Sequence, residues 1–382
     1  MTVTVRGLHP ETGELLRRVF LGQGARWQES REFSEEVFFE DVVSQGMAPL
    51  LFRRIASEVS SASAWPESLL LRLRKTALHQ AAFELVAELD LRHLLTAFAH
   101  VGISPLLLKG TPLSHALYPE PGLRPRCDTD LLIHEEDREK TAVLMKKQGY
   151  ASLHESQADY INTQMSSAKK TAQGITCRYD IHWQVSNCNR QFSREFSAGK
   201  LFENAEAIPS LGENARTLSK VDALIFSCFH RAGHFSHSGD RLIWLYDIHL
   251  LCQALTGQEI AAFCRRAKDL QIIFLCVDAI TTAQSWFGTV CPEELKLFLH
   301  EKAENEAATQ LLGSGRRDGI RKHTLLELKG LSGWQERFSY ILQNLFPPAD
   351  FMLWRYSKKK KLTLPWLYAR RFAEGLIIFL RK

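Results

Sequence analysis

The chain has 382 residues, of which 45% are hydrophobic and 10% aromatic, and it carries a formal net charge of +5. This composition excludes a disordered chain, and the length favours two or three structural units that share a sizeable core. The eight cysteines form no Cys-x-x-Cys pair, and no apolar run has the length of a signal-peptide core or a spanning helix. We therefore expect a cytoplasmic protein whose cysteines are reduced.

Residues 1–101 are predicted to form a helical region. Pro10 and Ser34 each open an amphipathic stretch with an acidic residue in its first turn. From Pro66 to His100 apolar residues recur at helical spacing, which predicts one long helix or two joined helices. Nothing in this region requires a chemical role.

Residues 102–210 contain the strand signals and the first candidate site residues. Short apolar runs at 106–108 and 131–133 predict two buried strands, and a short helix is expected between them. Asp128 and Asp130 directly precede the second run. Because residues two apart on a strand point to the same face, these two carboxylates should project together.

A third carboxylate, Asp180, lies in the strand-like run 176–183, which should form a hairpin with the segment after residue 150 around a polar loop at 166–174. Three carboxylates on neighbouring strands can hold two metal ions for phosphoryl or nucleotidyl transfer. The expected ion is Mg²⁺, two per site, with Mn²⁺ as the alternative, because both prefer oxygen ligands. By itself an Asp-x-Asp is a weak signal, since most such pairs are solvated.

Phosphate-binding candidates lie around these acids. Lys109, Gly110 and Thr111 form the turn into the short helix, whose free N–H groups would attract phosphate, although an ordinary strand-to-helix turn explains the glycine equally well. Arg124, in the following loop, is placed to contact a triphosphate. His182 should share a face with Asp180, where it either binds phosphate or makes a hydrogen bond in the core.

Residues 211–346 are again predicted to be helical. His230 and His234 are one helical turn apart and His237 follows, but the segment lacks the glutamate of a His-Glu-x-x-His zinc site. Arg241 begins the next predicted helix, where it faces a cleft or joins a helix-start salt bridge. An exposed basic loop is expected at 313–322.

Residues 347–382 form a basic amphipathic tail. From Arg355 onward it carries nine Lys or Arg and one acid, a local charge of +8. Such a tail either packs on the body with a solvated basic face or rests on an anionic membrane. Binding of nucleic acid through Lys358–Lys361 is the less favoured alternative.

Several short motifs occur in a characteristic order along the chain: Lys109-Gly110, Tyr118-Pro119, Gly122-Leu123-Arg124, Asp128-Thr129-Asp130-Leu131-Leu132, Gly149-Tyr150, Asp180-Ile181-His182-Trp183, and then His230, His234, Arg241, Trp244 and Asp247. Over about residues 80–250 this combination resembles the uncharacterised nucleotidyltransferases of the polymerase-beta-like superfamily. One difference is the turn at 109–111, which is Gly-Ser in most of the superfamily.

The resemblance implies an α+β fold, in which a small mixed β-sheet core is flanked by N-terminal and C-terminal helical regions. It implies that the three acids hold metal and triphosphate, and that Asp180 activates the acceptor. The phosphates would be held by Lys109, Gly110, Thr111 and Arg124. The cleft would be lined by His230, His234 and Arg241.

The implied reaction moves a nucleoside monophosphate from an NTP, with ATP expected, to an unidentified acceptor and releases pyrophosphate. Two alternatives remain open: a catalytically inactive binding protein that kept the scaffold, and a membrane-associated scaffold that acts through the basic tail. A cytoplasmic location, peripheral to the inner face of the membrane, would suit the tail.

Overall fold

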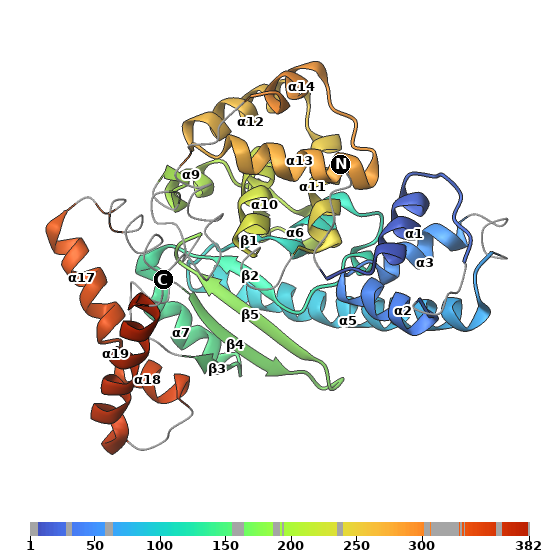
Figure 1. Cartoon of the computed structure of the whole chain (residues 1–382). Coiled ribbons are helices and arrows are strands. Elements are labelled where there is room, and N and C mark those ends of the chain that lie inside the picture. Colours follow the sequence, from blue (N-terminus) through green and yellow to red (C-terminus); the bar gives the residue numbers. More distant parts are fainter. Residues whose placement is uncertain are drawn as a thin grey trace.

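A computed structural model describes most of the chain, namely residues 7–27, 33–57, 64–154, 164–185, 192, 195–234, 240–301, 306, 328, 331, 333–356 and 361–380. Its architecture is α+β, as expected, with a mixed seven-stranded sheet among many helices (Figure 1). The expected basic loop at 313–322 lies outside the described residues. The cysteines that are described are all free thiols.

The sheet has the strand order β3-β4-β5-β2-β1-β7-β6. Central strand β2 is antiparallel to β1 and parallel to β5. The strands are β1 (Leu106–Leu108), β2 (Thr129–Leu132), β3 (Ala151–His154), β4 (Gln164–Lys170), β5 (Thr176–His182), β6 (Glu206–Ala207) and β7 (Arg216–Thr217).

Both short apolar runs are confirmed as strands, β1 and β2. The predicted polar loop at 166–174 was too long, because residues 166–170 belong to β4 and pair with β5 as far as Lys170 opposite Thr176. The polar side chains of residues 166–170 led to the prediction of a loop. The strand forms nevertheless, because it is held by backbone hydrogen bonds to β5, which polar residues can also make.

The described part of residues 7–101 is largely helical, and the stretch predicted as one or two helices forms a single helix, Glu67–His100. The helices are α1 (Pro10–Phe20), α2 (Glu35–Ser44), α3 (Ala48–Ala56) and α5 (Glu67–His100). The C-terminal half of α5 packs against one face of the sheet, where Leu91, Leu94 and Phe98 share a buried cluster with Leu107 and Leu131.

The opposite face of the sheet is covered by the helices that follow it in the chain (Figure 1). Leu106, Leu108 and Leu132 belong to this second buried cluster, to which α10 contributes Phe226 and α6 contributes Leu113. The connecting and covering helices are α6 (Gly110–Leu117), η1 (Pro121–Leu123), η2 (Glu135–Asp137), α7 (Arg138–Lys147), α9 (Ala198–Glu203), η3 (Pro209–Leu211), α10 (Lys220–His234), α11 (Leu242–Ala254), α12 (Gly257–Asp269), α13 (Ile273–Phe287) and α14 (Glu293–Leu299).

The C-terminal helices form a separate group at the left of Figure 1. Within it α19 packs on both α17 and α18. These elements are α17 (Trp334–Leu345), α18 (Ala349–Arg355), η4 (Lys361–Thr363) and α19 (Leu364–Leu380). In the part of the chain that the structure describes, no helix is both long and apolar enough to cross a membrane.

Candidate functional site

Two of the three predicted carboxylates lie on adjacent strands, and the third directly precedes one of these strands. Asp130 of β2 stands in register with Asp180 of β5, and in a parallel pair such residues point to the same side of the sheet. Because Leu131 packs towards α5, its neighbour Asp130 must face the other side, towards α6 and α10. Asp128 precedes β2, and the charges of Asp130 and Asp180 both act on its carboxyl.

Asp130 is the buried centre of this group. Its Oδ1 lies 2.5 Å from Lys109 Nζ and 3.0 Å from His182 Nε2. Burial by itself would raise the pKa of this carboxyl, but the Lys109 ammonium and the His182 hydrogen bond outweigh burial and hold the pKa well below its usual range. Asp130 is therefore ionised in the folded protein.

Asp128 has the opposite character. Burial, together with the negative charges of Asp130 and Asp180, raises the pKa of its carboxyl above the ordinary value, and Lys109 and Arg126 only partly offset this effect. The repulsion means that a cation beside Asp128 would be stabilised electrostatically.

Asp180 is oriented by a residue that sequence reasoning missed. The Ser166 hydroxyl donates a 2.6 Å hydrogen bond to Asp180 Oδ1. Ser166 stands directly opposite Asp180 in the β4–β5 ladder, in the segment that had been predicted as loop. Only the correct boundary of β4 could have identified it.

The donor set fits a hard cation, because carboxylate oxygens on one face of two neighbouring strands are the ligands that Mg²⁺ prefers. Within the described ranges, however, no three carboxylate, imidazole or thiol side chains are grouped closely enough to hold a metal ion as they stand. The ammonium group of Lys109 lies at Asp130 Oδ1, so it would have to leave that oxygen before a cation could bind there.

The turn at 109–111 enters α6 in an unusual conformation. Lys109 has a φ of +57°, in the region that favours glycine. At Gly110 a Cβ atom would lie 2.6 Å from Arg124 Cζ, so no side chain fits beside that guanidinium. Thr111 is buried, and its hydroxyl has no hydrogen-bond partner among the described residues. The first turn of α6 is thus tightly packed and retains an unused donor.

Arg124 lines the site, but its guanidinium already forms an ion pair with Asp247. Its guanidinium donates to both carboxylate oxygens of Asp247 on α11, with a shortest distance of 2.6 Å from Nη2 to Oδ2. The Tyr118 hydroxyl donates to the same carboxylate at 2.7 Å. The sequence could not reveal this pairing, because the two partners are 123 residues apart.

His230 and His234 lie together at the end of α10, with their Nε2 atoms 3.1 Å apart and their rings against Trp244. Burial, with the nearby Lys109 charge, lowers the pKa of His230 well below its ordinary value, so this imidazole is neutral. In the described part of the chain no third ligand completes a zinc site with them. His237 lies outside the described residues.

Arg241 precedes α11 and does not form the helix-start salt bridge considered from the sequence. Its Nε donates to the Ser44 carbonyl at 3.0 Å, and its guanidinium lies 5.7 Å from the Trp244 ring centre. The neighbouring Asp240 pairs with Arg231 instead. Burial and the charge of Arg124 lower the pKa of Arg241, so a nearby anion would be stabilised.

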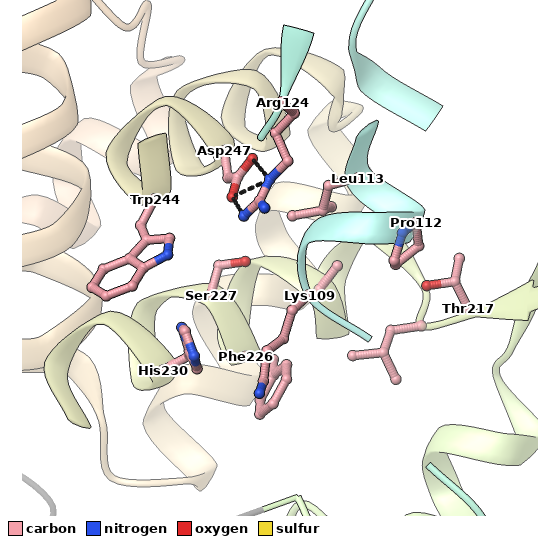
Figure 2. Close-up of a pocket in the computed structure, with 12 residues that line it drawn as sticks. Lys109, Pro112, Leu113, Arg124, Thr217, Phe226, Ser227, His230, Trp244 and Asp247 are labelled. Atoms are coloured by element: carbon pink, nitrogen blue, oxygen red, sulfur yellow. Dashed lines mark hydrogen bonds and ion pairs between the residues drawn. The ribbon is translucent and has the colours of Figure 1, made fainter. Parts of the chain in front are cut away.

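A narrow pocket lies between Lys109, His230 and the Arg124–Asp247 pair. Figure 2 shows Lys109, Ser227 and His230 on one side of it and the Arg124–Asp247 pair on the other, with Trp244 beside them. Its free volume is about 30 Å³, close to that of one water molecule. A nucleotide therefore has to bind at its mouth or displace side chains. Lys109 both lines the pocket and contacts Asp130.

A helix N-terminus can bind phosphate, and grouped carboxylates can hold the cations that assist phosphoryl or nucleotidyl transfer. A family model described as "Uncharacterised nucleotidyltransferase" matches residues 32–288, so the chain belongs to this nucleotidyltransferase family. A search of curated proteins gave no match.

Proposed function

We propose that this protein transfers a nucleoside monophosphate from an NTP, with ATP as the expected donor, to an acceptor and releases pyrophosphate in a Mg²⁺-dependent reaction. Membership of the family supports nucleotidyl transfer in general. The observation that carries the finer proposal is the alignment of Asp130 with Asp180 on one face of the sheet, beside Asp128.

Asp128, Asp130 and Asp180 would hold the cation, two Mg²⁺ or alternatively Mn²⁺. When bound, such ions neutralise the triphosphate and stabilise charge on the attacking and leaving oxygens. The raised pKa of Asp128 supports this assignment, because the repulsion between carboxylates is what a divalent cation would relieve.

Lys109 would exchange Asp130 for phosphate when the nucleotide binds. Its Nζ is already at the carboxylate face, and its partner Asp130 would then be free to bind the cation. The N–H groups of Gly110 and Thr111 in the first turn of α6 would also bind phosphate. Arg124, which is paired with Asp247, would support this turn from behind and would contact a phosphate only by exchanging Asp247 for it.

Asp180 would receive the proton of the acceptor. The acceptor oxygen or nitrogen forms a bond to the α-phosphorus, the bond from that phosphorus to the bridging oxygen breaks, and pyrophosphate leaves. Ser166 would keep Asp180 Oδ1 in place, and His182 does the same for Asp130. The opposite wall, with His230, His234 and Arg241, would contact the phosphates or the acceptor.

Titration calorimetry with ATP in the presence and absence of Mg²⁺ tests this proposal. We expect binding that depends on the metal, and incorporation of label when [α-³²P]ATP is incubated with the protein and cell lysate, with pyrophosphate as the second product. A catalytically inactive binding protein would give nucleotide affinity without incorporation. Absence of Mg²⁺-dependent affinity for all four NTPs would contradict the assignment.

A second candidate role, attachment to an anionic membrane, is favoured by the C-terminal helices. Trp334 and Phe338 of α17 are 75% and 60% exposed, and Trp366 of α19 is 56% exposed. Basic Arg370 lies beside Trp366. Exposed aromatic residues next to basic ones suit the headgroup region of a membrane, and such attachment would place the enzyme at the inner face.

Flotation with vesicles that contain phosphatidylserine should show binding that Trp334→Ser with Phe338→Ser weakens at least tenfold. The matched control is Leu297→Ser, a change at a residue that is 65% exposed on α14. Equal binding of both variants would refute a membrane role for α17. The alternative of nucleic-acid binding rests on the segment from Lys358, most of which lies outside the described residues.

A further inference from the structure

The longest helix carries a stripe of exposed leucines that the site does not use. On α5, Leu71 and Leu85 are each 65% exposed, and Leu78 and Leu89 are each 59% exposed. Other faces of α5 pack on α3, on η1 and on the sheet. Single exposed leucines are ordinary, but four in one row on one helix form an apolar surface.

The spacing of this stripe is that of a two-helix seam. Leu71, Leu78 and Leu85 are seven residues apart, and Leu89 follows after four more. Lys75 and Ala82 fill the intervening positions and are also exposed. The resulting 4-3-4-3-4 pattern has the period of 3.5 residues that keeps a seam facing a partner helix in a coiled coil.

A groove runs along one side of the stripe, between α5 and the segments α3 and η1. Its volume is about 680 Å³, and its lining includes Phe52, Ala81 and Leu123. Three charged residues of α5 line it as well: Arg74, Glu84, which is buried and paired with Arg126, and Glu88. A helix that covered the leucines would also fill this groove.

The charges beside the stripe favour a second copy of α5 as the partner, in an antiparallel orientation. Arg74 and Glu88 each lie seven residues from Ala81, on opposite sides of it. In an antiparallel pair of identical helices centred near Ala81, Arg74 would face Glu88 of the partner subunit, and the contact would occur twice. Glu88 Oε1 already accepts from Arg92, so Arg74 would add a second cation to this carboxylate. A parallel pair would instead place Lys75 against the same lysine of the partner, with like charges in the seam.

We infer that α5 docks against the α5 of a second copy of this chain, antiparallel and across a two-fold axis near Gln80 and Ala81. In this arrangement Leu71 meets Leu89 of the partner subunit and Leu78 meets Ala82 of the partner subunit. The small side chain of Ala82 in the seam allows the two helices to approach closely. The inference does not rest on the proposed function, because the stripe contains none of the candidate site residues.

Sedimentation velocity across a concentration series tests the association. The wild-type chain should approach twice the 43.6 kDa monomer mass. Leu78→Glu with Leu85→Glu should raise the dimer dissociation constant at least tenfold, whereas Leu297→Glu, which alters an equally exposed leucine on α14, should not. A wild-type chain that stays monomeric at 100 µM, or a Leu78→Glu/Leu85→Glu variant that still forms the dimer, would overturn the inference.

Charge exchange tests the direction. Arg74→Glu should weaken the dimer, and Arg74→Glu combined with Glu88→Arg should restore it. In a Cys127→Ser background, Ala81→Cys should crosslink between subunits with a short bismaleimide, because the two copies of residue 81 face each other. Lys75→Cys should not, since the antiparallel pair separates its two copies by roughly 18 Å along the axis. Crosslinking at 75 in place of 81 would overturn the antiparallel arrangement.

Discussion

Asp128→Asn combined with Asp130→Asn should lower nucleotidyl transfer by at least about 10³-fold, the order of loss expected when preorganised charge is removed from an active site. Both carboxylates are needed because they would bring the cation and the triphosphate to the acceptor. The measurement is label transfer from [α-³²P]ATP under saturating Mg²⁺. Circular dichroism should show an unchanged fold. Retention of more than a tenth of the wild-type rate would refute the assignment.

The two single variants should affect stability in opposite directions. Asp130 has a lowered pKa, so its ionised form stabilises the fold above the ordinary pKa of 3.8, and this contribution is lost as pH falls through the folded-state pKa. Asp130→Asn removes the Lys109 ion pair and should destabilise the fold by about 1–3 kcal/mol.

Asp128 has a raised pKa, so its contribution favours folding below pH 3.8 and is lost as pH rises through the folded-state value. At pH 7 Asp128→Asn should therefore raise the thermal midpoint of the metal-free protein, while Mg²⁺ should stabilise the wild type only. Thermal denaturation with EDTA and with Mg²⁺ measures both effects. A lower midpoint for metal-free Asp128→Asn would contradict the electrostatic account of this site.

Asp247→Ala should cause the largest loss of stability, about 3–5 kcal/mol, because it leaves the buried Arg124 guanidinium without its carboxylate. The Tyr118 hydroxyl would lose its acceptor in the same variant. Neither group can move away easily, since Gly110 packs directly against the guanidinium. Urea denaturation followed by tryptophan fluorescence gives the free energy of unfolding.

The control for this prediction removes both charges. Arg124→Met with Asp247→Leu replaces the ion pair by apolar side chains of similar size and should recover most of the lost stability, because a buried pair contributes little net free energy beyond the desolvation of its charges. If the double variant has as low a free energy of unfolding as Asp247→Ala, the loss of stability comes from disrupted side-chain packing and not from an unpaired charge.

Local patterns in the sequence were sufficient for several elements of this protein. The apolar runs that became β1 and β2 and the 34-residue helix α5 follow from the periods of strands and helices. These features depend on neighbours within a few residues, so the sequence alone determined them.

The tertiary structure decided which groups meet. Lys109 occupies Asp130, Ser166 holds Asp180, and Arg124 is neutralised by Asp247 instead of being free for phosphate. Each of these contacts joins residues that are 14 to 123 positions apart. They depend on strand register and on how helices from distant segments pack over the sheet, and periodicity within one segment carries no information about either.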